Sequence, residues 1–395
     1  MRKLALFALV LAACGSDFVP QSEIAGFRVL GMRADPPDLH PGDVANLRSL
    51  VVDPTQPSLP ITMLYLACDP DPTGLGSNAC SQYQTVADAQ GLFLSDGGLP
   101  AGTHFLGINT ASYTAPVGLF NAQPADAIPR KAGVLAVVLA VALETDVSSL
   151  PQGADASQLF ALVLSKQIPS QLVIKRLRVS EDPELNHNPE LGLVATDTDV
   201  ISATHPLLVL PGASVPLFAS TSSGAHESYI SIGLDGTTDP RTETAEYSWF
   251  TSSGSFAQDR TVDSDTVQQY FNAPDGSGTG IDLAIPSDRH FTLWVVVRDG
   301  RGGEDWQSFP GLICDPNAPA ASLASAQIQS GEISATGENL DGIVDATLDG
   351  QPLVGSYQAA LSAFVARIPA GTRGTHTLEV RDQSCHRSQT TLTAP

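Results

Sequence analysis

The chain has 395 residues, and its 42 acidic and 20 basic side chains give a formal net charge of −22 at pH 7. Nucleic acids and anionic lipid surfaces are bound through clustered Lys and Arg side chains, so this charge argues against both as partners. Hydrophobic residues still form 42% of the chain and charged residues only 16%, which excludes a disordered polyanion and leaves room for about two to four packed domains.

The first fourteen residues are typical of an exported protein. Arg2 and Lys3 precede an apolar run at 4–11, which has the length of a secretory signal core and is too short for a membrane-spanning helix of about 20 residues. The quartet LAAC at 11–14 resembles the lipobox of bacterial lipoproteins. That resemblance implies removal of residues 1–13, lipid on the Cys14 sulfur and acylation, such as by palmitate, of the new amino group. An ordinary signal peptide that ends beside a cysteine is the alternative.

The residue after Cys14 bears on which membrane of the cell envelope holds the protein. In lipoproteins an aspartate at that place favours retention at the inner membrane, whereas this chain has Gly15. Two or three acyl chains hold a soluble domain firmly on a membrane surface. We therefore expect a cell-envelope protein on the outer membrane, with residues 14–26 as a tether between the lipid and the folded body.

Short apolar or alternating runs, cut by Asp-Pro, Pro-Gly and Asp-Gly pairs, dominate the rest of the chain and favour all-β sandwiches. FRVLGMRADPPDLHPGDVANLRSLVVDP, from residue 27, resembles the two opening strands of bacterial immunoglobulin-like domains, with Leu47 and Val51 in the core. ITMLYLAC at 61–68 is expected to be a third strand, with Tyr65 as a buried aromatic side chain.

The run AGVLAVVLAVAL at 132–143 is too short to span a membrane and predicts a central strand buried on both faces. QLVIKRLRVS at 171–180 is expected to close the domain. The first immunoglobulin-like sandwich is therefore predicted over 27–180, with long loops. Residues 181–204 begin EDPELNHNPELG, which has two prolines and no apolar period, and this predicts a linker.

The next segment repeats the pattern. VLPGASVPLFAST at 209–221 resembles another opening pair of strands, and HFTLWVVVRDGRGGEDW at 290–306 predicts two strands around a glycine-rich turn. Trp249, Trp294 and the RDGRGG turn resemble PKD-like and related immunoglobulin-like domains. The resemblance implies a second sandwich over 205–313.

The C-terminal segment resembles an IPT/TIG domain. The matching positions are GENL at 337–340, Asp349-Gly350 and Ile368-Pro369. This resemblance implies a third sandwich over 318–395, of a kind that occurs as a module in many surface proteins and has no catalytic residues of its own. The predicted fold class is therefore all-β, with tandem immunoglobulin-like β-sandwiches.

Four cysteines remain once Cys14 is assigned to lipid. An even number in an exported chain indicates two disulfides, for which three connectivities exist. Cys68 and Cys80 are close together in CDPDPTGLGSNAC, so we pair them, and Cys314 is then left for Cys385. A metal site is disfavoured because the CxxC or Cys/His spacing that zinc needs is absent.

Motifs of catalysis are missing from the sequence. It contains no Gly-x-Ser-x-Gly, no HExxH and no P-loop, and its eight histidines are scattered. DGSGTG at 275–280 is not followed by a helical pattern that could present amide groups to a phosphate, so it predicts a hairpin loop. We expect no enzyme and no cofactor, with a hydrolase as a remote alternative.

Two groups of residues are candidates for binding a specific ligand. Alternating aspartates place two carboxylates on one side of an extended segment, as calcium requires, although solvated turn carboxylates are the plainer interpretation; the pairs are Asp69/Asp71, Asp197/Asp199 and Asp263/Asp265. Trp249, Trp294 and Trp306 could form a sugar-binding platform, although tryptophans on sandwich strands usually lie in the core.

These patterns together predict a membrane-anchored envelope lipoprotein that acts as a non-catalytic binding or structural module. Its partners would be the membrane, through the N-terminal lipid, and an envelope protein or a polysaccharide. A carbohydrate-binding or calcium-dependent adhesion protein is the alternative. The sequence predicts no bound metal as its main interpretation.

Overall fold

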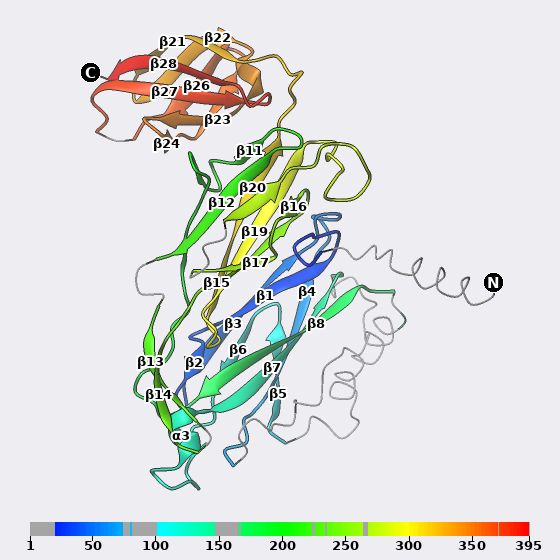
Figure 1. Ribbon diagram of the computed structural model, residues 1–395, viewed down its shortest axis with the longest axis vertical. Helices are drawn as coiled ribbons and strands as arrows, with labels where there is room; N and C mark the ends of the chain where they lie inside the picture. The colour runs from blue at the N-terminus through cyan, green and yellow to red at the C-terminus, as the bar shows by residue number, and fades with distance from the viewer. Residues whose placement is uncertain are drawn as a thin grey trace, which may run out of the picture.

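The computed structural model describes residues 20–73, 80, 101–146, 165, 167–222, 226–233, 235–263, 268–369 and 371–394. These residues form tandem immunoglobulin-like β-sandwiches (Figure 1). Cys14, the predicted lipidation site, lies outside the described residues. No helix in the described part of the chain has the length and apolar character needed to span a membrane.

The first sandwich packs a three-stranded sheet, β1-β3-β6, against a five-stranded sheet, β2-β8-β7-β4-β5. Its elements are β1 (Arg28–Asp35), β2 (Asp38–Leu39), β3 (Val44–Val52), β4 (Thr62–Cys68), β5 (Thr103–Ile108), β6 (Ala111–Thr114), α3 (Ile128–Ala132), β7 (Val134–Leu143) and β8 (Ser170–Val179). The strands predicted at 61–68, 132–143 and 171–180 are β4, β7 and β8, and they are neighbours in the larger sheet.

The strand β7 is buried on both faces, as its uniformly apolar sequence predicts. Ala136, Val138 and Ala140 face the core between the two sheets. On the opposite face, Val137 and Leu139 pack with the disulfide-bonded Cys68 and Cys80. Tyr65 in β4 is also fully buried, with its hydroxyl 3.0 Å from Ser49 Oγ, while Leu47 is buried and Val51 is only partly so.

The second sandwich consists of the sheets β10-β9-β12-β18-β16 and β11-β20-β19-β15-β17, with the separate hairpin β13-β14. Its strands are β9 (Leu191–Ala195), β10 (Val200–Ile201), β11 (Leu207–Val209), β12 (Ser214–Thr221), β13 (Ser228–Ile232), β14 (Thr238–Thr242), β15 (Glu246–Thr251), β16 (Ser255–Phe256), β17 (Arg260–Val262), β18 (Gln269–Asn272), β19 (His290–Arg298) and β20 (Glu304–Ile313). The strands β9 and β10 fall inside the predicted linker 181–204. They join the sheet because Leu191, Val194 and Ile201 bury their side chains in the core of this sandwich.

The strand β19 has an apolar face on each side of its sheet. Phe291, Leu293, Val295 and Val297 point into the core of the second sandwich. Trp294 and Val296 point the other way, into a cluster that includes Leu30 and Val52 of the first sandwich. The β15–β19–β20 sheet therefore has the first sandwich on its outer face.

The third sandwich packs β21-β22-β26-β25 against β24-β23-β27-β28 around its own core. Its elements are β21 (Ser322–Gln329), β22 (Glu332–Glu338), η3 (Leu340–Gly342), β23 (Ile343–Leu348), β24 (Gln351–Pro352), β25 (Gly355–Gln358), β26 (Ala363–Arg367), β27 (Gly374–Asp382) and β28 (Arg387–Ala394). The match at GENL coincides with the end of β22 and the start of η3, where Asn339 adopts the left-handed conformation (φ 54°).

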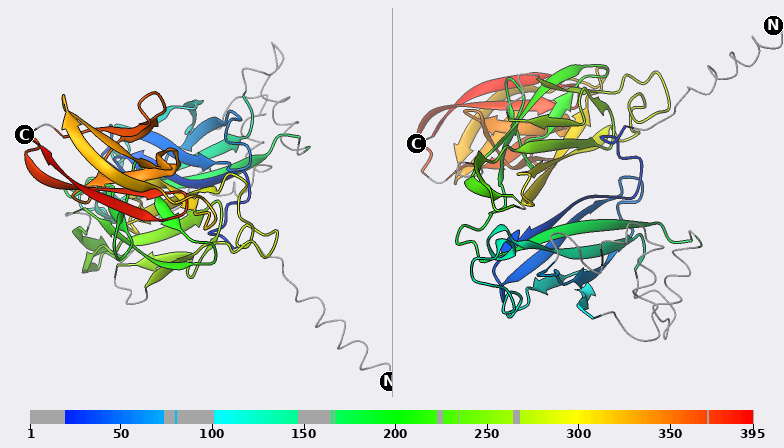
Figure 2. Two further views of the ribbon diagram at one scale, coloured as in Figure 1. Left: turned by 90° about the horizontal axis from the view of Figure 1, so that it is seen from above. Right: turned by 60° about the horizontal axis from the view of Figure 1, so that its bottom comes forward.

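The three sandwiches follow the long axis of the molecule, with the third at one end (Figure 1). The first and second lie beside one another, and the third sits next to the second (Figure 2). The hairpin β13–β14 extends from the second sandwich toward α3 of the first. The positions where the sandwiches meet are therefore the places where distant segments of the chain come together.

Candidate functional site: the two interdomain junctions

The junction between the first and second sandwiches is built around a buried carboxylate. Glu304, at the start of β20, has only 6% of its side chain exposed. Its Oε1 accepts a hydrogen bond from Arg298 Nη2 at 2.7 Å, and its Oε2 lies 3.4 Å from Lys175 Nζ of the first sandwich. Beside this group, Arg33 of β1 donates to Asp305 at 2.7 Å.

Close approach of the β1 backbone to the Glu304 side chain makes this contact possible. Gly31 in β1 lies so near Glu304 that a Cβ at this position would collide with the Glu304 carboxylate. Burial lowers the pKa of Lys175, and the neighbouring Glu304 carboxylate partly offsets that shift. The charges of this cluster thus have partners in both sandwiches, and removal of any one would leave another charge buried.

The segment predicted as a linker contributes two hydrogen-bonded asparagine side chains, one buried and one partly buried. Asn186 is fully buried and donates through Nδ2 to Asp299 Oδ2 at 2.9 Å. Asn188 donates to the Ala34 carbonyl at 2.8 Å and accepts from the Glu304 backbone N–H at 3.0 Å. Their short polar side chains made this segment resemble a solvated linker. Inside the junction, however, Asn186 bonds a carboxylate and Asn188 satisfies two backbone groups.

The tether predicted over 14–26 is held against the second sandwich in its described part, 20–26. Ile24 is buried in the same apolar cluster as Trp294, and its backbone N–H donates to the Thr251 carbonyl at 2.8 Å. Burial, with the nearby Asp282 and Asp259, raises the pKa of Glu23 to about 6. The chain therefore enters the folded body on its flank, beside the end of β15.

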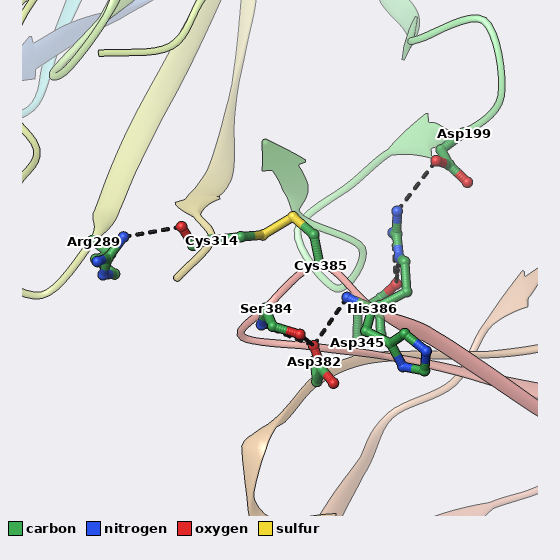
Figure 3. The surroundings of a disulfide bond; sticks show 9 residues. Asp199, Arg289, Cys314, Asp345, Asp382, Ser384, Cys385 and His386 are labelled. Atoms are coloured by element: carbon green, nitrogen blue, oxygen red, sulfur yellow. Dashed lines mark hydrogen bonds and ion pairs between the residues drawn. A yellow bond between two sulfur atoms is a disulfide. The ribbon is translucent and has the colours of Figure 1, made fainter. Parts of the chain in front are cut away.

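The junction between the second and third sandwiches contains a disulfide (Figure 3). Cys314, which follows β20, is bonded to Cys385 in the turn between β27 and β28. Arg289 donates to the Cys314 carbonyl at 2.9 Å, and Asp382 Oδ1 accepts from the backbone of Ser384 and His386 at 2.8 and 3.0 Å. Because Cys314 directly follows β20, the bond ties the third sandwich to the last strand of the second.

A charged cluster lies next to the disulfide. Arg381 of β27 donates to Asp345 at 2.7 Å and to Asp199 of the second sandwich at 3.2 Å. His205 Nδ1 lies 2.9 Å from Asp345 Oδ1. Hydrogen bonds with Asp199 and Asp345 raise the pKa of His205 to about 9, and the same contact with His205 lowers the pKa of Asp199.

This junction also borders a cleft of about 530 Å³ with walls from both sandwiches. The residues that line it are mostly hydroxyl, amide and charged side chains: Thr198, Asp199, Ser202, His205, Thr347, Asp349, Gln351, Thr377, Glu379 and Arg387. Among the described residues that line the cleft there is no Phe, Tyr or Trp side chain on which a planar ligand could stack. Its charged groups are already paired, since Arg387 contacts both Asp199 and Glu379.

One aspartate of each pair in the calcium hypothesis is bound by protein donors. Asp69 contacts His104 and Tyr113, Asp199 contacts two arginines, and Asp263 contacts Tyr247 and His226. Asp265 lies outside the described residues. The described part of the chain contains no group of three or more His, Cys, Asp or Glu residues placed to hold a metal ion.

The tryptophans do not form the exposed platform of the sugar hypothesis. Trp249 is 1% exposed in the core of the second sandwich, with Nε1 donating to Thr261 at 2.9 Å. Trp294 is 7% exposed in the first junction, where the partly buried Trp306 also packs. Both predicted disulfide pairs, Cys68–Cys80 and Cys314–Cys385, are present in the structure.

No protein-family model and no curated protein matches this sequence. Among solved structures, it is similar to SGBP-B of a Bacteroides ovatus mixed-linkage glucan utilization locus. The identity is 12%, the match covers 97% of this chain and 69% of that chain, and the TM-score is 0.17. A 1.5-MDa bacterial ice-binding adhesin matches at 10% identity over 93% and 97% of the two chains, with a TM-score of 0.19. Three domains of the bacteriophage RB49 outer capsid protein Hoc match at 11% identity over 93% and 98%, with a TM-score of 0.18. These likenesses concern the β-sandwich fold and carry no argument about function.

Proposed function

We propose that this protein is a lipid-anchored scaffold of the bacterial cell envelope that acts in binding and not in catalysis. The lipobox resemblance at 11–14 supports the anchor, and Gly15 after the cysteine supports the outer membrane. In this proposal the first sandwich covers 27–180, the second extends from 191 to 313, and the IPT/TIG-like third covers 318–395.

The observation that carries the proposal is the closure of both junctions. Independent modules need only solvated linkers, whereas here Glu304 and Arg381 each contact charged groups of two sandwiches. Breaking a buried ion pair is costly, because the remaining charge loses its partner without regaining water. Such junctions hold one relative orientation, which is what a scaffold that presents a surface at a fixed place requires.

The histidines support a non-catalytic role. Several of them form the His–carboxylate half of a catalytic triad, as with His205–Asp345 and His376–Asp349. A triad also needs a nucleophile on the second ring nitrogen. In these two pairs that nitrogen contacts Arg381 Nη2 and the Arg373 carbonyl, respectively.

The anchor is tested by the Cys14→Ala variant. We expect it to lose the acyl label, and to accumulate as precursor or appear in the soluble fraction, because the acylated sulfur and amino group are gone. Metabolic labelling with a fatty acid and membrane fractionation measure both effects. The Gly15→Ala variant leaves LAAC intact and should remain on the membrane. Normal processing and unchanged membrane partition of Cys14→Ala would refute the anchor.

A further inference from the structure

One sheet of the second sandwich has an outer face that the first sandwich does not cover. The first sandwich packs on the outer side of the β15–β19–β20 sheet, so the opposite sheet, with β9, β12 and β18, faces away from it (Figure 1). In β12 the alternate residues Val215, Leu217 and Ala219 point to the core. The outer face consists of Ser214, Pro216, Phe218 and Ser220 in β12, Tyr270 and Asn272 in β18, Leu193 and Ala195 in β9, and Val200 in β10.

Strand register places the large side chains of this face next to each other. Pro216 is opposite Tyr270, and Phe218 is two residues further along the same face of β12, so the two aromatic rings are diagonal neighbours. Val200 and Phe218 are both opposite Ala195. Phe218 is 44% exposed, Tyr270 37%, Leu193 42% and Val200 50%, although side chains of this kind are usually buried.

The polar positions of this face, and Gln268 beside it, carry uncharged hydrogen-bonding groups. Ser214 donates to Asn272 at 2.8 Å at one end of the face, and Ser220 lies at the other end beside Leu193. Tyr270 donates its hydroxyl hydrogen to Gln268 at 2.9 Å. Among the described residues, no strand position on this face is charged, and Asp263, which is paired with His226, lies only at its edge, in a chain whose net charge is −22. A ligand that matches this surface is therefore uncharged, rich in hydroxyl groups and able to lie flat on aromatic rings.

The apolar area is too small for a stable protein partner. At exposures of 37–50%, the four large side chains offer roughly 300 Å² of surface in total. A standard protein interface buries about 800 Å² on each partner. A sugar ring is much smaller, and it presents a flat patch of C–H groups to an aromatic ring while its hydroxyls reach the polar groups at the side.

We infer that the outer face of β9, β12 and β18 binds a neutral polysaccharide, with Phe218 and Tyr270 stacking on consecutive sugar rings. Ser214, Ser220, Asn272 and Gln268 bond the hydroxyl groups. The site rests on the proposed binding role, but it is independent of the lipid anchor. It replaces the tryptophan platform that the sequence suggested, since Trp249 and Trp294 are buried.

The test is affinity electrophoresis of the full chain in gels that each contain one glycan. Two of the glycans are neutral, hydroxyethylcellulose and a soluble conjugate of chitin oligosaccharides, and the charged comparison is polygalacturonate. We expect one of the neutral glycans to retard the protein and polygalacturonate to leave it unretarded. Phe218→Ala and Tyr270→Ala should each weaken the retardation at least tenfold. Matched controls are Phe105→Ala and Tyr357→Ala, which remove the same ring types at 50% and 38% exposure in the first and third sandwiches.

Three results would overturn this inference. The first is no retardation by either neutral glycan, and the second is retardation that the Phe105 or Tyr357 variants lose equally. The third is self-association in sedimentation experiments that Phe218→Ala abolishes, which would assign the face to a second copy of the chain. Thermal unfolding of each variant shows that it is folded. Fractionation of Cys14→Ala reports on the anchor alone, so the two proposals fail separately.

Discussion

The two junctions hold neighbouring sandwiches in different ways. The first buries apolar side chains from three segments, including Ile24, Leu30 and Trp294, around the ion pairs of Glu304. The second joins Cys314 to Cys385 and adds the charged cluster of Arg381. The first therefore depends on packing and buried charge within one surface, and the second on a covalent bond supported by polar contacts.

The difference follows from which strand faces are available. The strand β19 has apolar side chains on both faces, so a second sandwich can pack along its length. The third sandwich instead meets the second through turns and strand ends, which the disulfide and the charged cluster of Arg381 hold together. We therefore expect reductant to affect only the second junction, and loss of a buried charge to affect chiefly the first.

The largest effect is expected from removal of the interdomain disulfide. The double variant Cys314→Ser/Cys385→Ser opens a loop with a sequence separation of 71 residues, for which loop entropy gives about 4 kcal/mol. Hydrogen exchange should therefore speed up in β21–β28 and remain slow in β15 and β19. The Cys68→Ser/Cys80→Ser variant is the control, because its effect of about 3 kcal/mol should stay within the first sandwich. Equal exchange in β21–β28 with and without the Cys314–Cys385 bond would contradict the prediction.

A smaller loss is expected when the first junction loses its central carboxylate. Glu304→Ala leaves Lys175 and Arg298 without their partner, which costs about 3 kcal/mol for a buried pair. Urea unfolding followed by tryptophan fluorescence, to which Trp294 and Trp306 at this junction contribute together with Trp249, measures this change. Glu379→Ala removes an exposed pair with Arg387 and should cost less than about 1 kcal/mol. If the two variants unfolded at the same urea concentration, Glu304 would not be central to the junction.

Local sequence patterns predicted the strands well. The run at 132–143 is β7, the run at 171–180 is β8, and the alternation from Phe291 to Val297 is β19. Each is long and apolar, so its period is visible without knowledge of its neighbours. Tyr65 and Trp249 are buried, as expected for aromatic side chains on strands inside a sheet.

Contacts between sandwiches were not predicted, because they join residues that no local period connects. Lys175 interrupts the apolar pattern of QLVIKRLRVS, and its partner Glu304 is 129 residues away. Asn186 and Asn188 have the composition of a linker, yet both are hydrogen-bonded inside the first junction. Phe218 and Tyr270 could have been singled out only from strand register, which places both on the outer face.

The smallest expected effect is the pH dependence of the stability of the second junction. Because contacts with Asp199 and Asp345 raise the pKa of His205 to about 9, its charged form stabilises the second junction. Unfolded histidine titrates near pH 6.5, so this contribution is fully present below that pH and is lost as the pH rises through about 9. We expect about 1 kcal/mol once solvent screening is allowed for.

The measurement compares wild type with His205→Gln between pH 6.5 and pH 9.5, using hydrogen exchange in β23 and β27. Other groups, including Lys175 at the first junction, also respond to alkali, so the informative quantity is the difference between the two proteins. Wild type should lose its advantage over the variant as the pH rises, while the exchange of β19 stays alike in both. An advantage that persists at pH 9.5 would mean that the charge of His205, which faces Asp199, Asp345 and Arg381, does not hold the second junction.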